Sequence, residues 1–161
     1  TGKQVAQGEV GEIRVRGETV MKGYWNRPNE TEETISADGW LRTGDLGHLD
    51  ENGRLFISAG RKKDLIIRAG ENVSPLAIEN ALMNHPAIAE VAAVGIADER
   101  VGEKVKVFAV LREGAQATGQ ELKELCRKKL PAFMIPDTFQ FMESLPKTAT
   151  GKIVKADLKN T

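Results

Sequence analysis

Gly60-Arg61-Lys62-Lys63-Asp64 is the stretch at which the pattern of this sequence changes. Residues 1 to about 60 are rich in glycine and turn signals, with short alternating runs that are typical of half-exposed strands. Beyond about residue 64, runs that fit strands alternate with runs that fit helices. No Gly/Ser-rich linker separates the two halves. We therefore predict an α+β fold, with a small antiparallel β-subdomain over residues 1–62 and a compact domain over 63–161. In that second domain, helices would flank a sheet of roughly three strands.

Local signals predict the elements of the N-terminal half. Residues 10–16 alternate between apolar and polar side chains, which predicts a strand. Asn52-Gly53 lies between two apolar runs, and this pair favours a hairpin over 49–57 whose tight turn has positive φ. Residues 29–35 fit one short helix, which would end before the Asp38-Gly39 turn.

Capping signals predict where the helices of the C-terminal half begin. Ser74 followed by Pro75 is typical of an N-cap with proline in the first turn. Thr118 and Glu121 form a capping box, and the residues after them continue at helical spacing. The other expected elements are strands over 88–96, 104–111 and 139–142 and a final short helix near 153–158.

The composition argues against several classes of partner. The 161 residues are 40% hydrophobic, and Lys+Arg and Asp+Glu each number 23. A chain without net charge has no general field to attract nucleic acid or an anionic membrane. No apolar run approaches the roughly 20 residues that a membrane-spanning helix needs. We therefore expect neither a nucleic-acid partner nor a transmembrane segment.

Cys126 is the only cysteine, and it lies in a run with helical spacing. No intramolecular disulfide is possible, so a reducing compartment such as the cytoplasm is expected. We interpret Cys126 as a buried structural thiol, because no histidine partner is evident in the sequence around it. With only His48 and His85 present, no protein-bound metal site is expected.

Two polar residues of the N-terminal half are candidate nucleotide ligands. The Asp45 carboxylate, after Thr43-Gly44, could accept hydrogen bonds from both hydroxyls of a ribose, and the alternative is an ordinary turn with a capping Asp. Arg61 offers a planar set of donors for ribose or phosphate oxygens. Its alternative is a surface arginine paired with Asp64 or another nearby carboxylate.

A third candidate lies close to the C-terminus, in Pro146-Lys147-Thr148-Ala149-Thr150-Gly151-Lys152. Threonines and a glycine favour a mobile, hydrogen-bonding loop, and the loop presents the ammonium group of Lys152. Lysine and glycine are common in surface loops, so this motif alone is weak. The other two clusters, in the same order along the chain, strengthen it.

Together these segments resemble the adenylate-forming superfamily, and most of all the C-terminal third of an acyl-CoA synthetase. The resemblance extends over essentially the whole chain. The segments that carry it are Gly11–Gly17 with Gly23–Asn26, the aromatic-x-R-T-G-D-L signature at Trp40–Leu46, the hinge and glycine hairpin at Gly60–Glu79, and the lysine loop at Pro146–Lys152.

The resemblance implies a role for each candidate residue. Asp45 and Arg61 would bind the ribose of ATP and of the adenylate. Lys152 would reach the substrate carboxylate and the α-phosphate, and would offset negative charge as the carboxylate attacks phosphorus. Lys63 would be the hinge at which the C-terminal domain rotates between two half-reactions. Gly70 would lie in the hairpin 66–73 that lines the pantetheine tunnel, where it would keep side-chain bulk away.

The sequence departs from the family pattern at two positions. Ala77 stands where the family usually has a glutamate, and Lys155 stands where many members have arginine. The segment 69–75 looks like the CoA-ligase version of the hairpin, because the aromatic residue and arginine of peptide-synthetase domains are missing after Gly70. The alternatives are an adenylation domain that loads a carrier protein, a luciferase-like member, and a non-catalytic binding module.

The resemblance also implies that this chain is a fragment. Residues 1–62 would be the end of a large N-terminal adenylating domain, as a distorted β-barrel-like subdomain, and 63–161 its mobile AMP-binding lid. The main partner would be the missing N-terminal domain, which holds the phosphate loop and the acyl pocket. The substrates would be ATP with Mg²⁺, coenzyme A and a carboxylic acid, expected to be a fatty or aryl acid. The isolated chain is expected to be inactive.

Overall fold

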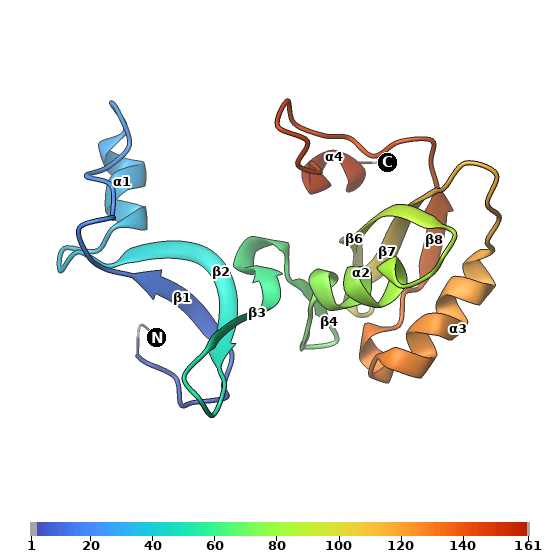
Figure 1. The fold of residues 1–161 in the computed structure, drawn as a ribbon, viewed down its shortest axis with the longest axis horizontal. Coiled ribbons are helices and arrows are strands. Elements are labelled where there is room, and N and C mark those ends of the chain that lie inside the picture. The colour runs from blue at the N-terminus through green and yellow to red at the C-terminus, as the bar shows by residue number, and fades with distance from the viewer. Residues whose placement is uncertain (1–2, 161) are drawn as a thin grey trace. The chain divides into compact units, whose positions relative to one another are not determined.

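The computed structural model describes residues 3–160, apart from the side chains at positions 58 and 59. It divides into two compact units, Thr1–Lys63 and Asp64–Thr161, which Figure 1 shows in blue to green and in green to red. Helices are few and both sheets are largely antiparallel, so the predicted α+β class is confirmed. The assignment of the two units to an adenylating domain and its lid stays a prediction.

The first unit is a three-stranded antiparallel sheet in the order β1-β2-β3. Its elements are β1 (Gly11–Val15), α1 (Pro28–Thr34), β2 (Leu41–Leu49) and β3 (Leu55–Arg61). The strand, short helix and hairpin predicted from the sequence are therefore all present. The 3₁₀ helix η1 (Lys62–Asp64) follows β3.

The turn between β2 and β3 differs from the predicted tight turn. Gly53 has the expected positive φ of 75°, but Asn52 does not have a positive φ. The Asp50 carboxylate accepts hydrogen bonds from the backbone N–H groups of Asn52 and Arg54, at 2.9 and 2.8 Å. The connection is therefore a three-residue loop that ends in a left-handed glycine, which is the next most common hairpin type.

The first unit leaves much apolar surface in contact with solvent. Among its described residues, Leu46 is the one apolar side chain that is buried. Leu49, Leu55 and Ile57, in or beside the β2–β3 hairpin, are 42%, 55% and 60% exposed. Trp25 is 88% exposed. Both tryptophans of the chain, Trp25 and Trp40, belong to this unit.

The second unit is built on a five-stranded sheet. Its elements are β4 (Ile66–Arg68), β5 (Glu71–Val73), α2 (Pro75–Met83), β6 (Ile88–Asp98), β7 (Gly102–Leu111), α3 (Gly119–Lys129), η2 (Ala132–Met134), β8 (Thr138–Phe141) and α4 (Lys155–Leu158). The sheet order is β5-β4-β7-β6, and β8 pairs with β7 in parallel. The three predicted strands correspond to β6, β7 and β8, and the glycine hairpin adds β4 and β5 to them.

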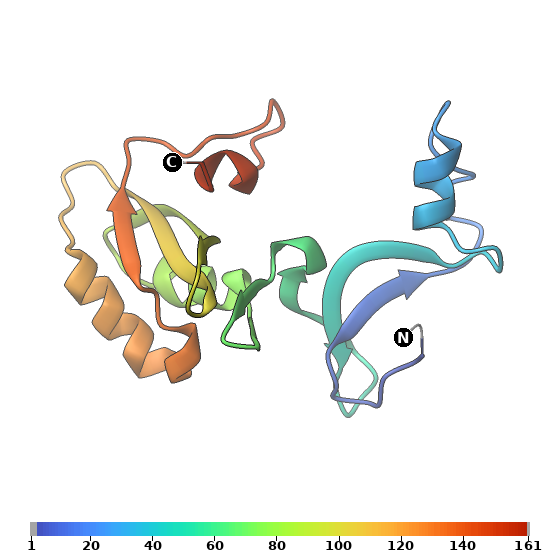
Figure 2. The ribbon, with the colours of Figure 1, turned by 180° about the vertical axis from the view of Figure 1, so that it is seen from behind.

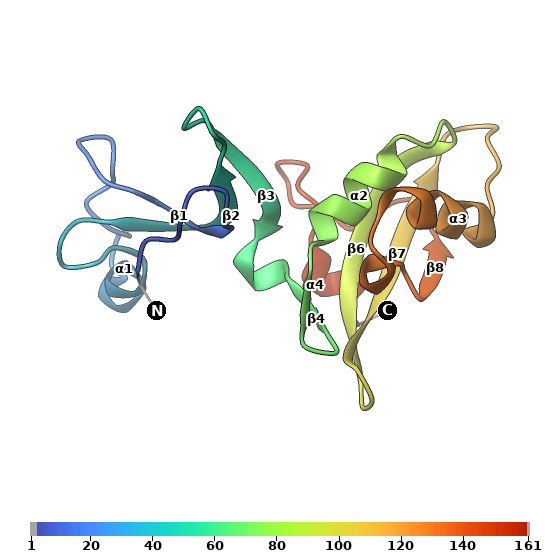
Figure 3. The same cartoon turned by 90° about the horizontal axis from the view of Figure 1, so that it is seen from below.

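Helices cover one face of this sheet and the C-terminal segment covers the other. Helix α2 packs along β6 and next to α3, as Figure 3 shows. Beneath them lies a core that includes Ile78, Leu82 and Cys126. On the opposite face, Phe108 packs with Leu145 and Leu158 in a second core. Figures 1 and 2 show α4 and α3 on opposite sides of β6 and β7.

The predicted helix caps are confirmed. The Ser74 hydroxyl accepts a hydrogen bond from the backbone N–H of Ala77 at 3.2 Å, and Pro75 occupies the first turn of α2. At α3, the Thr118 hydroxyl accepts from the N–H of Glu121 at 3.2 Å, and the Glu121 carboxylate accepts from the N–H of Thr118 at 2.8 Å. These caps satisfy backbone donors that the helices themselves leave free.

Cys126 is fully buried in the core beneath α2 and α3, as a structural thiol should be. Burial raises the pKa of this thiol from 9.0 to about 11. Only the thiolate is nucleophilic, so a pKa raised by about two units lowers the fraction of thiolate at pH 8 about 100-fold. We expect alkylation by iodoacetamide to be at least that much slower in the folded chain than in urea. Rapid alkylation of the folded protein would show that this part of the core opens.

Candidate functional site

Asp45 and Arg61, both predicted to contact a nucleotide, lie opposite each other on β2 and β3. The Arg61 Nε lies 3.3 Å from the Asp45 Oδ1, and the Arg61 Nη2 donates a hydrogen bond to the Thr43 carbonyl at 3.0 Å. Arg61 therefore pairs with Asp45 and not with Asp64. The second carboxylate oxygen of Asp45 has no hydrogen-bond partner among the described residues, and the side chain is 37% exposed.

The backbone before Asp45 is held in an uncommon conformation. Gly44 has a φ of 74°, which glycine adopts without a steric penalty. The Thr43 hydroxyl donates to the Ile13 carbonyl at 2.9 Å and accepts from the N–H of Asp45 at 3.1 Å. Thr43 therefore ties this segment to β1 and fixes the orientation of Asp45. No local signal in the sequence had indicated this role for Thr43.

An open cleft of about 510 Å³ lies beside this pair, lined by Gly44, Arg61, Lys62 and Lys63. Three of these four residues are cationic, but Arg61 is already paired with Asp45, so only part of this charge is free for a ligand. Lys62 forms an ion pair with Glu12 at 3.4 Å. Lys63, the predicted hinge residue, lies exposed in η1 and contacts no acidic side chain within the described residues.

Gly70 lies at the tip of the β4–β5 hairpin. Ala69 and Gly70 have φ values of 50° and 85°, and two successive positive φ values are typical of a type I′ turn. A Cβ atom added at Gly70 would meet no atom within 4 Å. The turn conformation thus explains this glycine, and no described residue crowds it. The prediction that Gly70 makes room for pantetheine concerns a ligand and remains untested.

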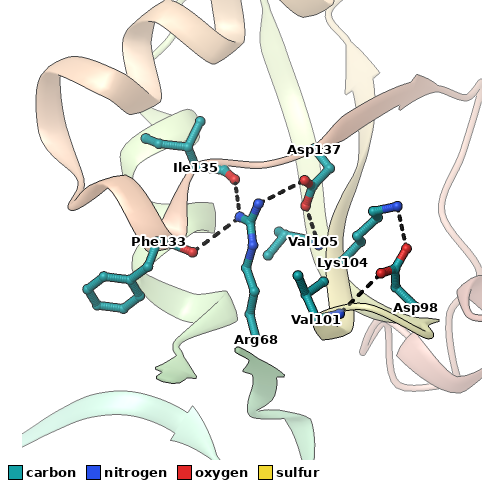
Figure 4. A network of polar contacts seen from close by, with 8 residues as sticks. All are labelled: Arg68, Asp98, Val101, Lys104, Val105, Phe133, Ile135 and Asp137. Carbon is teal, nitrogen blue, oxygen red and sulfur yellow. Dashed lines mark hydrogen bonds and ion pairs between the residues drawn. The ribbon is translucent and has the colours of Figure 1, made fainter. Parts of the chain in front are cut away.

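Arg68 fixes the base of this hairpin, as Figure 4 shows. Its Nη1 donates to the carbonyl oxygens of Phe133 and Ile135 at 3.2 and 2.8 Å, and its Nη2 donates to Asp137 at 2.8 Å. Asp137 also accepts from the N–H of Val105 on β7 at 2.8 Å. The hairpin is thereby attached to both β7 and the segment before β8. The sequence carried no signal for this network, because its members are 32 to 69 residues apart.

The predicted lysine loop is a small closed hairpin. Lys147 and Ile153 form an antiparallel bridge. The N–H of Thr148 donates to the Lys152 carbonyl, and the N–H of Val154 to the Pro146 carbonyl, each at 2.8 Å. Gly151 has a φ of 81° at the turn. The hydrogen-bonded arms place Lys152 at the end of an ordered hairpin, whereas a mobile loop had been expected.

Lys152 differs from the other lysines of this segment. Lys147 forms an ion pair with Glu90, and Lys155 forms one with Glu79, each at 2.7 Å. The exposed Lys152 side chain makes no ion pair or hydrogen bond within residues 3–160. It is therefore the lysine of the loop that is available to an anionic ligand. The roles of Glu79 and Glu90 were missed, since nothing local in the sequence connects them to the loop.

The described residues contain no group of three or more His, Cys, Asp or Glu side chains that could hold a metal ion. The candidate residues are instead of two kinds, and each unit holds one kind. Asp45 and Arg61 offer acceptors and donors suited to a sugar, and Lys152 offers one unpaired positive charge. Such groups bind, orient and stabilise negative charge, which is what nucleotidyl transfer requires of a protein.

Comparison with known proteins identifies relatives that share the whole chain. Residues 77–152 match the AMP-binding enzyme C-terminal domain. The chain is 48% identical over 158 residues to the long-chain-fatty-acid–CoA ligase of Bacillus subtilis (strain 168). That match covers 98% of this chain and 28% of the relative, over the C-terminal portion of the latter. The chain thus spans less than a third of the length of this relative.

Solved structures give the same result. The chain matches ATP-bound MatB from Rhodopseudomonas palustris with a TM-score of 0.90 and 36% identity, over 99% of this chain and 32% of that one. With the apo crystal structure of the same protein the TM-score is 0.73 at the same coverage. The o-succinylbenzoate CoA synthetase of Bacillus subtilis, in complex with its acyl-adenylate intermediate, gives 0.91 and 38% identity, over 98% of this chain and 32% of that one.

Proposed function

Because residues 77–152 belong to the AMP-binding enzyme C-terminal domain family, we propose that this chain is the C-terminal part of an AMP-forming acid–CoA ligase. The full-length protein would activate a carboxylic acid as its acyl-adenylate, with release of pyrophosphate, and then transfer the acyl group to coenzyme A. The observation that carries this proposal is the unpaired ammonium group of Lys152 at the end of an ordered hairpin.

We assign Asp45 and Arg61 to the ribose of ATP and of the adenylate. The free carboxylate oxygen of Asp45 would accept from the ribose hydroxyls, while the ion pair with Arg61 holds the carboxylate in position. Charge-assisted hydrogen bonds of this kind are worth about 1.5–3 kcal/mol each. The open cleft beside the pair supports this assignment, because it leaves room for a ligand next to Asp45 and Arg61.

In adenylate formation, a carboxylate oxygen of the acid attacks the α-phosphorus and pyrophosphate leaves. Negative charge builds up on the α-phosphate oxygens during this step. The ammonium group of Lys152 would stabilise that charge and hold the incoming carboxylate. A charge that is already in place needs no reorganisation at the moment of reaction, which is why it is effective.

We further propose that η1, with Lys63, is the hinge between the two half-reactions. Rotation there would withdraw Lys152 and bring the hairpin around Gly70 to the thiol of coenzyme A. One comparison supports a hinge in this family. At equal coverage the chain matches ATP-bound MatB better than apo MatB, so the corresponding region of MatB differs in shape between its two crystal structures.

The missing N-terminal domain is the proposed main partner of this chain. The relatives are about three times longer than the chain, and the first unit exposes Leu49, Leu55 and Ile57. A contiguous exposed apolar surface is typical of an interface.

Since nothing in these residues resembles a phosphate loop, we expect the 161-residue chain alone to release no pyrophosphate.

The substrate class rests on the relatives. One is named for long-chain fatty acids and another for o-succinylbenzoate, so we propose a fatty or aryl acid. Magnesium would enter with ATP, and we assign no described residue to it.

No helix among the described residues is long and apolar enough to cross a membrane. We propose a cytoplasmic location, supported by the single, buried cysteine.

The test is pyrophosphate release by the full-length protein with a panel of carboxylic acids, with and without coenzyme A. Turnover that needs both the acid and coenzyme A, with thioester as product, would support the proposal and identify the substrate. Adenylation that is indifferent to coenzyme A would indicate a carrier protein as acceptor. Failure with every acid would favour a non-catalytic binding module. The 161-residue chain is the matched negative control.

Asp45→Ala in the full-length protein should raise the KM for ATP about 10- to 100-fold, the equivalent of one lost charge-assisted hydrogen bond. Glu33→Ala is the matched control, because Glu33 is an exposed carboxylate on α1 of the same unit and does not line the cleft. Steady-state kinetics of pyrophosphate release with ATP varied would measure both. An unchanged KM in Asp45→Ala would remove Asp45 from the nucleotide site.

A further inference from the structure

We infer that two carboxylates, Glu79 and Glu90, are positioning residues that hold the Lys152 hairpin through Lys155 and Lys147. This inference rests on the proposed role of Lys152 and extends it to the elements that carry the hairpin. The two ion pairs flank Lys152 in the sequence, five residues before it and three after it. Each joins the C-terminal segment to a different element, since Glu79 lies in α2 and Glu90 in β6.

The Glu79 contact is the more deeply buried of the two. The Lys155 and Glu79 side chains are only 21% and 16% exposed. The same Glu79 oxygen accepts a hydrogen bond from the N–H of Ala93 on β6 at 2.9 Å. The hydrogen bond from β6 therefore holds the Glu79 carboxylate in position independently of its ion pair with Lys155. Lys155 is the first residue of α4, so this contact sets where the C-terminal arm of the hairpin ends.

The Glu90 contact is poorly explained by stability alone. One oxygen of Glu90 receives the Lys147 ammonium group, while the other is buried and has no hydrogen-bond partner among the described residues. A buried acceptor without a donor costs free energy. The ion pair itself is partly exposed, with side chains 38% and 32% exposed, and such pairs contribute only about 0–1 kcal/mol. An arrangement with this cost is better explained by the position that it gives to Lys147, at the base of the hairpin.

The ion pairs also connect the Lys152 hairpin to the Gly70 hairpin, the two elements proposed to enter the site in turn. Helix α2 begins immediately after the hairpin β4–β5, which carries Gly70, and Glu79 of this helix holds Lys155. Glu103 makes a similar but weaker connection, because it accepts from the N–H of Ile67 at 2.7 Å and lies 3.8 Å from the Lys159 Nζ. The Lys152 hairpin and the Gly70 hairpin would then move as one rigid body.

Lys155→Met in the full-length protein tests the inference. It removes the ammonium group and keeps most of the side-chain volume. We expect kcat for adenylate formation to fall about 10- to 100-fold, because small displacements of a reacting group have effects of this size. The KM for ATP should change little, and thioester formation from supplied acyl-adenylate should be spared. Lys155→Arg, which restores the positive charge, should recover most of the rate.

Lys104→Met is the matched control. Lys104 pairs with Asp98 at the β6–β7 turn of the same unit, as Figure 4 shows, and among the described residues it forms no ion pair with the Lys152 hairpin. It should leave both half-reactions unchanged. Glu90→Gln provides a second variant that removes the other ion pair, and it should lower kcat in the same direction.

A second measurement does not depend on catalysis. In the 161-residue chain, the amide protons of Gly151 and Val154 are held by hydrogen bonds within the hairpin. Their exchange with solvent, measured by NMR, should accelerate at least about tenfold in Lys155→Met, as expected where a local contact limits opening, and not in Lys104→Met. Equal exchange in the two variants, or full activity of Lys155→Met while Lys152→Ala is impaired, would overturn the inference. A wild-type protein that forms no adenylate would instead overturn the proposed function.

Discussion

Replacing Lys152 with alanine in the full-length protein should slow adenylate formation by about 10²–10³-fold, the effect of losing one preorganised group that stabilises the transition state. The structure supports a large effect, since Lys147 and Lys155 are held by carboxylates and have no free ammonium group to substitute for it. Thioester formation from supplied acyl-adenylate should be largely spared. Rapid-mixing measurements of adenylate and of thioester would separate the two steps.

Lys128→Ala is the control for this experiment, because Lys128 is an exposed lysine on the surface of α3. It should behave as wild type in both half-reactions. Equal damage to both half-reactions in Lys152→Ala would mean that Lys152 stabilises the fold or acts in another way. Circular dichroism of the variant would tell these two explanations apart.

Phe108→Ala should lower the free energy of unfolding of the second unit by about 3–5 kcal/mol, which is typical for a buried phenylalanine. Phe108, on β7, is fully buried beneath the C-terminal segment, where it packs with Leu145 and Leu158. Its removal would leave a cavity directly beneath α4. Because both tryptophans belong to the other unit, urea unfolding should be followed by far-UV circular dichroism, with tryptophan fluorescence as an internal reference.

Phe141→Ala is the matched substitution in β8, where the side chain is 39% exposed. It should cost much less, about 1 kcal/mol or below, as is usual at partly exposed positions. If both variants lost the same stability, the second core would not depend on Phe108. The fluorescence transition of the first unit should be unaffected in both variants.

The sequence predicted the elements well wherever the signal was local. The Ser74 cap, the Thr118–Glu121 capping box and the alternating strand over 10–16 depend on neighbouring residues, and all of them are present. The β2–β3 turn was predicted less well, because Asp50 and not Asn52 organises it. Asparagine-glycine indicates a turn, but the residue that caps the loop decides its length.

The pairing of Asp45 with Arg61 could not have been predicted from spacing alone. Gly47 pairs with Ile57 and Leu49 with Leu55, so regular pairing would place residue 59 opposite Asp45. A register shift between Leu46 and Gly47 brings Arg61 there instead. Such a shift depends on how the strands pack and not on the local sequence. The chemistry of the two side chains and the intervening hairpin suggested that they could meet, the family resemblance assigned both to the ribose, and the bulge explains how the chain brings them together.

The exposed face of the β2–β3 hairpin also affects how this chain behaves when it is produced alone. Strand β3 lies at the edge of its sheet, with Leu55 and Ile57 exposed along it. An apolar edge strand is a template for pairing with other chains, so self-association should begin at this hairpin and increase with concentration. Charged substitutions there would favour a monodisperse sample for NMR, whereas the same changes in a full-length ligase would disturb any surface that covers the hairpin.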